Sequence, residues 1–297
     1  MSKTKIGIVG LGAIGGLLAI LLTKEKYEVF SNKNIKKKNT KIKLLSKYYG
    51  ELRASIKINK KLDNVDIIFV CSKFPYLKNS IKSIKNKKAL IVPLLNGLSH
   101  FSILKKKFLN KVYYANIGKI VLKKIKGNKI LHISYNKPEI IISSEKKNKL
   151  KKICNIFKEI NFNIKKINSN KIVIWQKLVR LSPISSITAL HNCSLGNIRK
   201  STIKMEQLEN LTKETLYLGK KLFGFKKSFK SIKKEIDKLP NNLTTSLQRD
   251  INSQNRNKSE IETQIGAIYK LATKSKIKLK TTAEIYKLLK SKCKKKY

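Results

Sequence analysis

The feature that most constrains this chain is a short apolar run that leads directly into a set of spaced glycines. Lys5–Val9 is rich in Ile and Val and predicts a strand, and glycines follow at Gly10, Gly12 and Gly15. In a strand–turn–helix unit the first glycine permits a tight turn and the second lets a pyrophosphate approach the backbone. The third lets the helix pack closely against the strand. The spacing therefore predicts a dinucleotide site.

The residues around these glycines place the motif in the right context. The apolar run from Gly15 to about Thr23 predicts a helix, and Tyr27–Ser31 predicts a second strand that completes a βαβ unit. Phosphate groups would then meet the free N–H groups and the positive end of the helix dipole. The alternative is a glycine-rich turn that binds nothing. We assign six residues of the turn to the cofactor: Gly10, Leu11, Gly12, Ala13, Ile14 and Gly15.

The end of the second predicted strand lacks an acidic residue. Proteins that bind NAD usually place Asp or Glu there to bind the ribose 2′-hydroxyl, whereas this chain continues as Ser31-Asn-Lys-Asn-Ile-Lys-Lys-Lys38. Lysines at this position, with Lys33 as the first, suit a 2′-phosphate. The missing acid is the stronger argument, because lysine is frequent throughout the chain. The sequence therefore favours NADPH over NADH as the cofactor.

The net charge of +51 raises the possibility of a nucleic-acid partner. Only five of the 68 basic residues are arginines, and the lysines are spread along the whole chain beside abundant Ile and Asn. Lys, Ile and Asn share A/T-rich codons, so a biased genome explains the charge more simply. An arginine-poor surface also lacks the bidentate contacts that read bases. We therefore expect no specific nucleic-acid partner, although the charge favours capture of small anions.

The spacing of the cysteines and the length of the apolar stretches indicate in which cellular compartment the protein is expected. The four cysteines lie far apart and form no C-x-x-C pair, which predicts neither a metal site nor disulfides and indicates a reducing environment. The longest apolar stretch, residues 7–22, contains several glycines and is shorter than a membrane span. The basic start leads into a strand rather than to a signal cleavage site. We expect a cytoplasmic protein that binds no membrane.

The rest of the chain predicts an α/β fold. Val65–Cys71 and Ala89–Leu95 are apolar runs typical of buried parallel strands, and they end in the polar pairs Ser72-Lys73 and Asn96-Gly97. Ligands gather at the carboxyl ends of such strands, so both pairs are expected to face the same crevice as the glycine turn. A more antiparallel-looking section follows between residues 112 and 142, and then a helix over residues 147–160.

From Lys171 onward the periodicity becomes helical, with no convincing strand. At 297 residues the chain is long enough for two domains. We predict a Rossmann-type dinucleotide-binding domain over residues 1–168 and an all-helical domain over residues 169–297. The predicted helices of the second domain are Val173–Leu190, Thr202–Phe223, Phe229–Lys238, Ser259–Ser275 and Ala283–Lys290.

Two further motifs complete a resemblance that covers nearly the whole chain. Trp175-Gln-Lys-Leu178 opens the helical domain, and Ser259-Glu-Ile-Glu262 opens a later helix, after Ser246-Leu-Gln-Arg-Asp250. With the glycine turn, Lys73 and the Asn96-Gly97 pair, this order of elements resembles the ketopantoate reductase (2-dehydropantoate 2-reductase) family. The resemblance implies an oxidoreductase that uses NADPH to reduce a small 2-keto acid, 2-dehydropantoate, to pantoate in the route to pantothenate and coenzyme A.

The resemblance also implies site residues. Lys73 and Asn96 would lie beside the nicotinamide, Lys177 and Glu260 would carry the active site, and Ser246 matches a family serine near the substrate carboxylate. The chemistry is consistent with these roles. Hydride transfer to a 2-keto group creates an oxyanion, which an ammonium group can stabilise and protonate. A carboxylate can hold the lysine or a substrate hydroxyl, and a carboxamide can orient the substrate or the cofactor.

Two positions depart from the family pattern. The family helix usually carries Asn four and eight residues after the catalytic lysine, and this chain has Leu181 and Ser185 there. We keep Ser185 as a substrate-binding candidate, whereas Leu181 offers no hydrogen bond. Pro183 lies between them and predicts a kinked or broken helix. A reductase of a more apolar 2-keto acid and a non-catalytic NADP(H)-binding sensor remain alternatives. We expect the protein to be a monomer or a homodimer.

Overall fold

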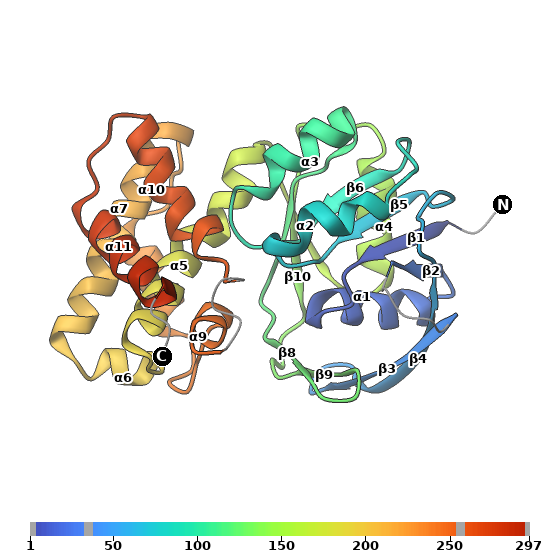
Figure 1. The fold of residues 1–297 in the computed structure, drawn as a ribbon, viewed down its shortest axis with the longest axis horizontal. Helices are drawn as coiled ribbons and strands as arrows, with labels where there is room; N and C mark the ends of the chain where they lie inside the picture. Colours follow the sequence, from blue (N-terminus) through green and yellow to red (C-terminus); the bar gives the residue numbers. More distant parts are fainter. Residues whose placement is uncertain (1–3, 33–37, 254–258, 295–297) are drawn as a thin grey trace. The chain divides into compact units, whose positions relative to one another are not determined.

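The computed structural model describes residues 4–32, 38–253 and 259–294. The chain divides into two compact units (Figure 1). The first comprises Met1–Leu95 and His100–Val173, and the second comprises Asn96–Ser99 and Ile174–Tyr297. Within the part of the chain that is described, no helix combines the length and the apolar character needed to cross a membrane.

The first unit is built on an eight-stranded sheet of order β6-β5-β1-β2-β4-β3-β9-β8. Its strands are β1 (Lys5–Val9), β2 (Glu28–Ser31), β3 (Asn39–Ser46), β4 (Gly50–Ile58), β5 (Ile67–Val70), β6 (Leu90–Pro93), β8 (Leu122–Ile125) and β9 (Lys129–His132). Strands β6, β5, β1, β2 and β4 are parallel. The strand order reverses at β1, because β2 lies on one side of it and β5 on the other. Ligands bind at such a switch point in open α/β sheets.

A second sheet has three strands in the order β11-β10-β7. Its strands are β7 (Ala115–Gly118), β10 (Glu139–Ser143) and β11 (Asn163–Ile167). The helical elements of the first unit are α1 (Ala13–Lys24), α2 (Phe74–Ser80), η1 (Ile81–Ser83), α3 (His100–Phe108), η2 (Leu109–Lys111) and α4 (Leu150–Glu159). As predicted, antiparallel pairs occur in this section, namely β7 with β10 and β8 with β9, although β10 and β11 are parallel.

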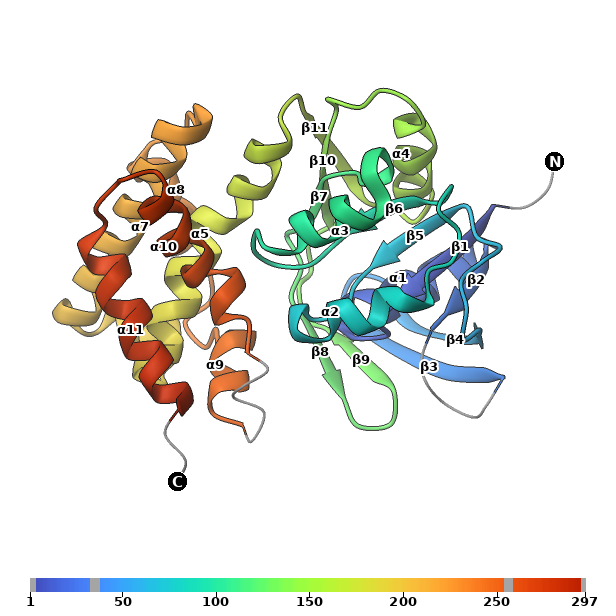
Figure 2. The same ribbon diagram turned by 45° about the horizontal axis from the view of Figure 1, so that its top comes forward.

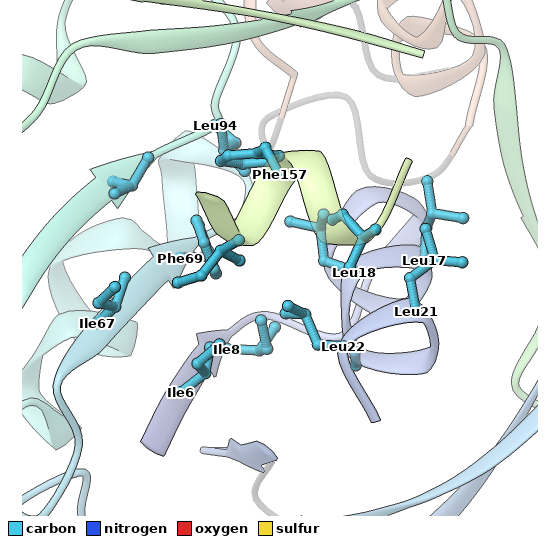
Figure 3. Packing of buried hydrophobic residues seen from close by; sticks show 14 of the residues in the cluster. Ile6, Ile8, Leu17, Leu18, Leu21, Leu22, Ile67, Phe69, Leu94 and Phe157 are labelled. Carbon is cyan, nitrogen blue, oxygen red and sulfur yellow. The ribbon is translucent and has the colours of Figure 1, made fainter. Parts of the chain in front are cut away.

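The core of the first unit forms where α1 and α4 cover one face of the large sheet (Figure 3). Alternate residues of the buried strands point to this face, as the pleat of a strand requires, and Ile8 and Phe69 are two of them. The rings of Phe69 and Phe157 meet edge to face with centroids 5.4 Å apart. Strands β3, β4, β8 and β9 also pack on α1, which explains why α1 is apolar almost all round.

The second unit is helical (Figure 2). Its elements are α5 (Asn170–His191, which begins in the first unit), α6 (Leu195–Arg199), α7 (Thr202–Phe223), α8 (Phe229–Asp237), α9 (Ser246–Ile251), η4 (Ile261–Thr263), α10 (Ile265–Lys274) and α11 (Lys280–Lys294). Ser201 caps the start of α7 by accepting a hydrogen bond from the backbone N–H of Lys204, and Gly224 ends the helix in the left-handed conformation. Trp175 is fully buried against the Phe223 ring.

The predicted fold class is confirmed, two local expectations are wrong, and one hairpin was not predicted. The helix α5 runs through Pro183 without a break. Proline removes one hydrogen bond, and the burial of residues 182–190 holds the helix together. The motif at Ser259 does not open a helix, because the non-helical backbone of Gln264 separates η4 from α10. The hairpin β3–β4 was not predicted, although Thr40, Ile42 and Leu44 alternate with exposed or half-buried residues in the way a strand requires.

Candidate functional site

The glycine turn joins β1 to α1 in the first unit, and two of its glycines are needed for close packing. Gly10 has φ +94°, and a Cβ there would lie 2.7 Å from the backbone nitrogen of Ser72. A Cβ on Gly15 would lie 2.1 Å from the Gly10 carbonyl oxygen. The carboxyl ends of β1 and β5 and the start of α1 therefore meet with no room for side chains at these two positions.

Gly12 is glycine for a different reason. Its backbone, at φ −77° and ψ −159°, is extended and open to any residue. A Cβ there would meet no atom within 4 Å. The missing side chain leaves open space over the turn, at the place where a pyrophosphate approaches the backbone in this motif.

The start of α1 has the electrostatic character of an anion site. Its N-cap, Gly12, provides no side-chain hydrogen bond, and the first turn of this fully described helix contains no acidic residue. The free N–H groups and the positive end of the helix dipole are therefore not neutralised by the helix itself. These features of the turn from Gly10 to Gly15 fit the pyrophosphate of a dinucleotide.

Asn32 is a residue of this site that the sequence analysis did not single out. It directly follows β2, and its Oδ1 accepts a hydrogen bond of 3.3 Å from the backbone N–H of Gly10. Its Nδ2 donates to the Ser80 carbonyl at 3.0 Å and to Ser83 Oγ at 2.9 Å. The position that is acidic in NAD-binding proteins therefore holds a neutral carboxamide that ties the turn to the end of α2. The sequence feature that could have identified Asn32 is its position directly after the second strand.

The remaining candidates of the first unit are only partly located. Ser72 is packed on the glycine turn, and its buried Oγ has no partner among the described residues. Lys73 follows it as the exposed N-cap residue of α2. Lys33, the first of the lysines predicted to bind a 2′-phosphate, lies outside the described residues, and so does Lys36.

The second unit brings Asn96 and Glu260 together across 164 residues of sequence. The Asn96 Nδ2 donates to the Glu260 carboxylate at 3.3 Å. The backbone N–H of Leu98 donates to the Thr263 carbonyl at 3.1 Å. Between them Gly97 has φ +87°, and a Cβ there would lie 2.0 Å from that carbonyl oxygen. Glycine is therefore required at position 97 so that the loop can lie directly on η4.

Lys177 interacts electrostatically with the same carboxylate. It is half-buried on α5, and its pKa is lowered from the usual 10.5 to about 8. Burial of the ammonium is the largest cause, and repulsion by Arg180 adds to it, while the buried carboxylate of Glu260 acts in the opposite direction. An amine with this pKa exchanges its proton near neutral pH, which is the range where general acids are effective.

The substrate candidates Ser185 and Ser246 lie on α5 and α9. Ser185 is two turns after Lys177 on the same helix face, and its buried Oγ has no partner among the described residues. Ser246 is half-buried at the first position of α9. A 2.9 Å hydrogen bond between the hydroxyls of Thr188 and Thr245 links α5 to the N-cap of α9. These two threonines hold α9 in place and were not predicted.

Among the described residues, no three His, Cys, Asp or Glu side chains are grouped in a way that could hold a metal ion. All four cysteines are free thiols. Two chemically distinctive groups stand out among the described residues, namely the open glycine turn of the first unit and the Lys177–Glu260–Asn96 cluster of the second.

Solved structures with the same fold cover almost the whole chain at low sequence identity. A ternary structure of D-mandelate dehydrogenase with NADH and anilino(oxo)acetate is 16% identical, covers 98% of both chains and has a TM-score of 0.85. A 2-dehydropantoate 2-reductase from Geobacter metallireducens is 16% identical over 97% of this chain and 99% of that one, with a TM-score of 0.83. A dimeric ketopantoate reductase from Staphylococcus aureus is 17% identical over 97% and 98%, with a TM-score of 0.78.

Comparison with protein families identifies both parts of the chain. No curated protein sequence matches it. Residues 6–142 match the family described as ketopantoate reductase PanE/ApbA, and residues 171–293 match the ketopantoate reductase PanE/ApbA C-terminal domain. The two matches occur in the family order and include the glycine turn and the Lys177–Glu260 pair. The chain therefore belongs to the ketopantoate reductase family.

Proposed function

We propose that this protein reduces a 2-keto acid with NADPH as the hydride donor, and that 2-dehydropantoate is the substrate. The observation that carries the proposal is the Lys177–Glu260–Asn96 cluster, in which an ammonium of lowered pKa interacts electrostatically with a buried carboxylate. A protein that only bound the cofactor would not need this cluster. The first unit is proposed to bind the cofactor and the second to bind the substrate, as predicted for residues 1–168 and 169–297.

The cofactor assignment rests on the glycine turn. The open space at Gly12 and the unneutralised start of α1 are proposed to hold the pyrophosphate. Lys73 and Asn96 remain proposals as nicotinamide contacts. A bound nicotinamide dinucleotide supplies the hydride of the reaction.

Lys177 is proposed as the general acid. As the substrate carbonyl oxygen gains negative charge, the protonated ammonium of Lys177 stabilises that oxygen and then donates its proton to it. Glu260 favours the protonated form of Lys177, because its carboxylate raises the pKa that burial lowers. Asn96 donates to Glu260 through Nδ2, and its buried Oδ1 has no partner among the described residues. This oxygen is a suitable acceptor for a substrate hydroxyl, and Ser185 and Ser246 are proposed as further substrate ligands.

The direct test is oxidation of NADPH in the presence of 2-keto acids of different polarity. We expect turnover with 2-dehydropantoate to exceed that with pyruvate and with the aromatic acid benzoylformate. NADPH binding without oxidation by any of these acids would favour the sensor. Products can be identified by mass spectrometry, which separates reduction of the acid from loss of NADPH by other routes.

A second candidate is reduction of a more apolar 2-keto acid. Leu181 lies one turn after Lys177 on the same face of α5, and its half-buried side chain offers only apolar contact. One of the solved structures with this fold is a D-mandelate dehydrogenase, whose name indicates an aromatic 2-hydroxy acid. Preference for benzoylformate over 2-dehydropantoate in the same panel would select this candidate.

We expect NADPH to bind at least about tenfold more tightly than NADH, a difference of about 1.4 kcal/mol. The reason is that Asn32 replaces the acidic residue that would favour a free ribose 2′-hydroxyl, while lysines follow it in the sequence. Fluorescence titration of both cofactors measures the ratio. Replacing Lys33 and Lys36 together by Glu should remove the preference. Equal affinities in the unaltered protein would contradict the NADPH assignment. NADH is the alternative cofactor, because a D-mandelate dehydrogenase with this fold was solved with NADH.

The reductive reaction is expected to slow as the pH rises through about 8, the pKa of Lys177. Reduction needs the protonated ammonium, so kcat/KM should be constant well below this pH and should fall about tenfold per pH unit well above it. The reverse oxidation should show the opposite dependence. In Glu260→Gln the loss of the carboxylate lowers the pKa of Lys177 further, so the falling limb should move to lower pH. A limb that stays in place would show that another group titrates.

A further inference from the structure

A lysine from outside the βαβ unit lies on the glycine turn. Lys124, on the edge strand β8, donates a hydrogen bond of 2.8 Å from its Nζ to the backbone carbonyl of Leu11. Leu11 stands between Gly10 and Gly12, so the ammonium is held at the part of the turn where the missing Cβ of Gly12 leaves open space. The two residues are 113 positions apart, and no motif in the sequence connects them.

The position of Lys124 is set by the hairpin that carries it. β8 pairs with β9 in antiparallel fashion, and β9 pairs with β3. At the turn of this hairpin, Asn128 donates from Nδ2 to Thr40 Oγ1 at 3.3 Å, and its carbonyl accepts from the N–H of Lys43 at 3.3 Å. The hairpin is thus tied to β3 by hydrogen bonds at its tip as well as along its strands. The β8–β9 hairpin therefore fixes the position of Lys124 beside the glycine turn.

The surroundings of Lys124 favour an anion beside it. The side chain is exposed to solvent, and it lines a small hollow with Leu11, Ile42, Asn128 and Ile130, so an anion over the turn can reach the ammonium. The start of α1 adds free N–H groups and no acidic residue. An ammonium has three donors, so a bond to the Leu11 carbonyl is compatible with a simultaneous contact to a phosphate oxygen.

We propose that Lys124 is a phosphate ligand of the dinucleotide site and that it contacts the pyrophosphate rather than the 2′-phosphate. The pyrophosphate lies over the turn that includes Leu11 and Gly12, whereas the 2′-phosphate is bound beyond the end of β2, after Asn32. The proposal deepens the proposed function and rests on it, because it assumes that a dinucleotide binds at this turn. It adds to the motif a charge that the motif itself does not contain.

The test compares binding of NADPH and NADH to the full-length protein and to Lys124→Met. Loss of a pyrophosphate ligand should weaken both cofactors by the same factor, about tenfold, and should reduce the dependence of Kd on salt. Lys124→Gln can still donate to Leu11 but carries no charge, so it should lose affinity as Lys124→Met does, and Lys124→Arg should retain most of it. Lys123→Met is the matched control, because the adjacent exposed lysine of β8 points to the opposite face of the strand.

The outcomes separate the inference from the proposed function. Normal affinity in Lys124→Gln together with a lower thermal stability of Lys124→Met would mean that the lysine only supports the turn, and would overturn the inference. Loss of NADPH affinity with NADH unchanged would also overturn it, because the contact would then be to the 2′-phosphate. If the unaltered protein binds neither cofactor, the proposed function fails and the inference fails with it.

Discussion

Replacement of Lys177 by alanine is expected to lower kcat for 2-keto acid reduction by roughly 10²- to 10⁴-fold, with little change in the Kd for NADPH. The variant loses both the positive charge that stabilises the developing oxyanion and the proton that the oxygen receives. The affinity for NADPH should persist because the proposed pyrophosphate site belongs to the first unit, whereas Lys177 belongs to the second. Steady-state kinetics and a fluorescence titration of NADPH measure the two quantities separately.

Two further variants sharpen this prediction. Lys220→Ala removes an exposed lysine of α7 in the same unit and should leave kcat unchanged. Lys177→Arg keeps a positive charge, but a guanidinium does not release its proton in the accessible pH range. It should recover part of the electrostatic stabilisation and lose the pH limb near 8 that belongs to the lysine. Unchanged turnover in Lys177→Ala would remove the residue from the mechanism, whatever the family of the chain.

The second large effect is expected at Gly12, where valine should weaken NADPH binding by at least about 100-fold, or about 2.8 kcal/mol. The backbone of Gly12 is extended, and no atom lies within 4 Å of its Cβ position, so the folded protein accommodates the side chain. The same side chain occupies the space that the pyrophosphate needs. Titration with NADPH should show the loss of binding, while the thermal unfolding midpoint without cofactor should change little.

Gly15→Ala should give the opposite pattern. Its new Cβ would lie 2.1 Å from the Gly10 carbonyl oxygen, so the turn and the start of α1 must move apart. We expect a clear fall in thermal stability from a single methyl group. Near-normal NADPH binding by folded Gly12→Val would show that the open space at this glycine is not occupied by the cofactor, and the pyrophosphate site would have to be sought elsewhere.

The sequence alone was sufficient where the determining interactions are local. The strand–glycine–helix unit was predicted from a few consecutive residues, because turn geometry and helix packing at a glycine depend on near neighbours. The helix α7 was predicted from its periodicity at its observed bounds, Thr202–Phe223, and in the structure Ser201 caps its start and Gly224 ends it. The family resemblance depended on motifs of the same short range, and the matches over both parts of the chain confirm it.

Sequence patterns were less informative where lysine replaces the usual polar residues. The strand β3 alternates buried and more exposed residues, but the abundant lysines of this chain make such alternation look like an ordinary solvated segment. The expectation that the proline of α5 breaks the helix was wrong, because burial of the surrounding residues outweighs the hydrogen bond that proline removes. In both cases the burial of the side chains determines whether the strand or helix forms, and the local sequence pattern indicates burial only indirectly.

The tertiary structure decided which distant groups act together. Asn32 meets Gly10, Lys124 meets Leu11, and Asn96 meets Glu260 only because strand order and loop packing bring these residues within hydrogen-bond distance. The lowered pKa of Lys177 has the same origin, since its burial and its proximity to the charged groups of Arg180 and Glu260 arise only in the folded chain. Desolvation and long-range contacts depend on the whole fold, so the sequence could name the lysine but could not determine its charge state.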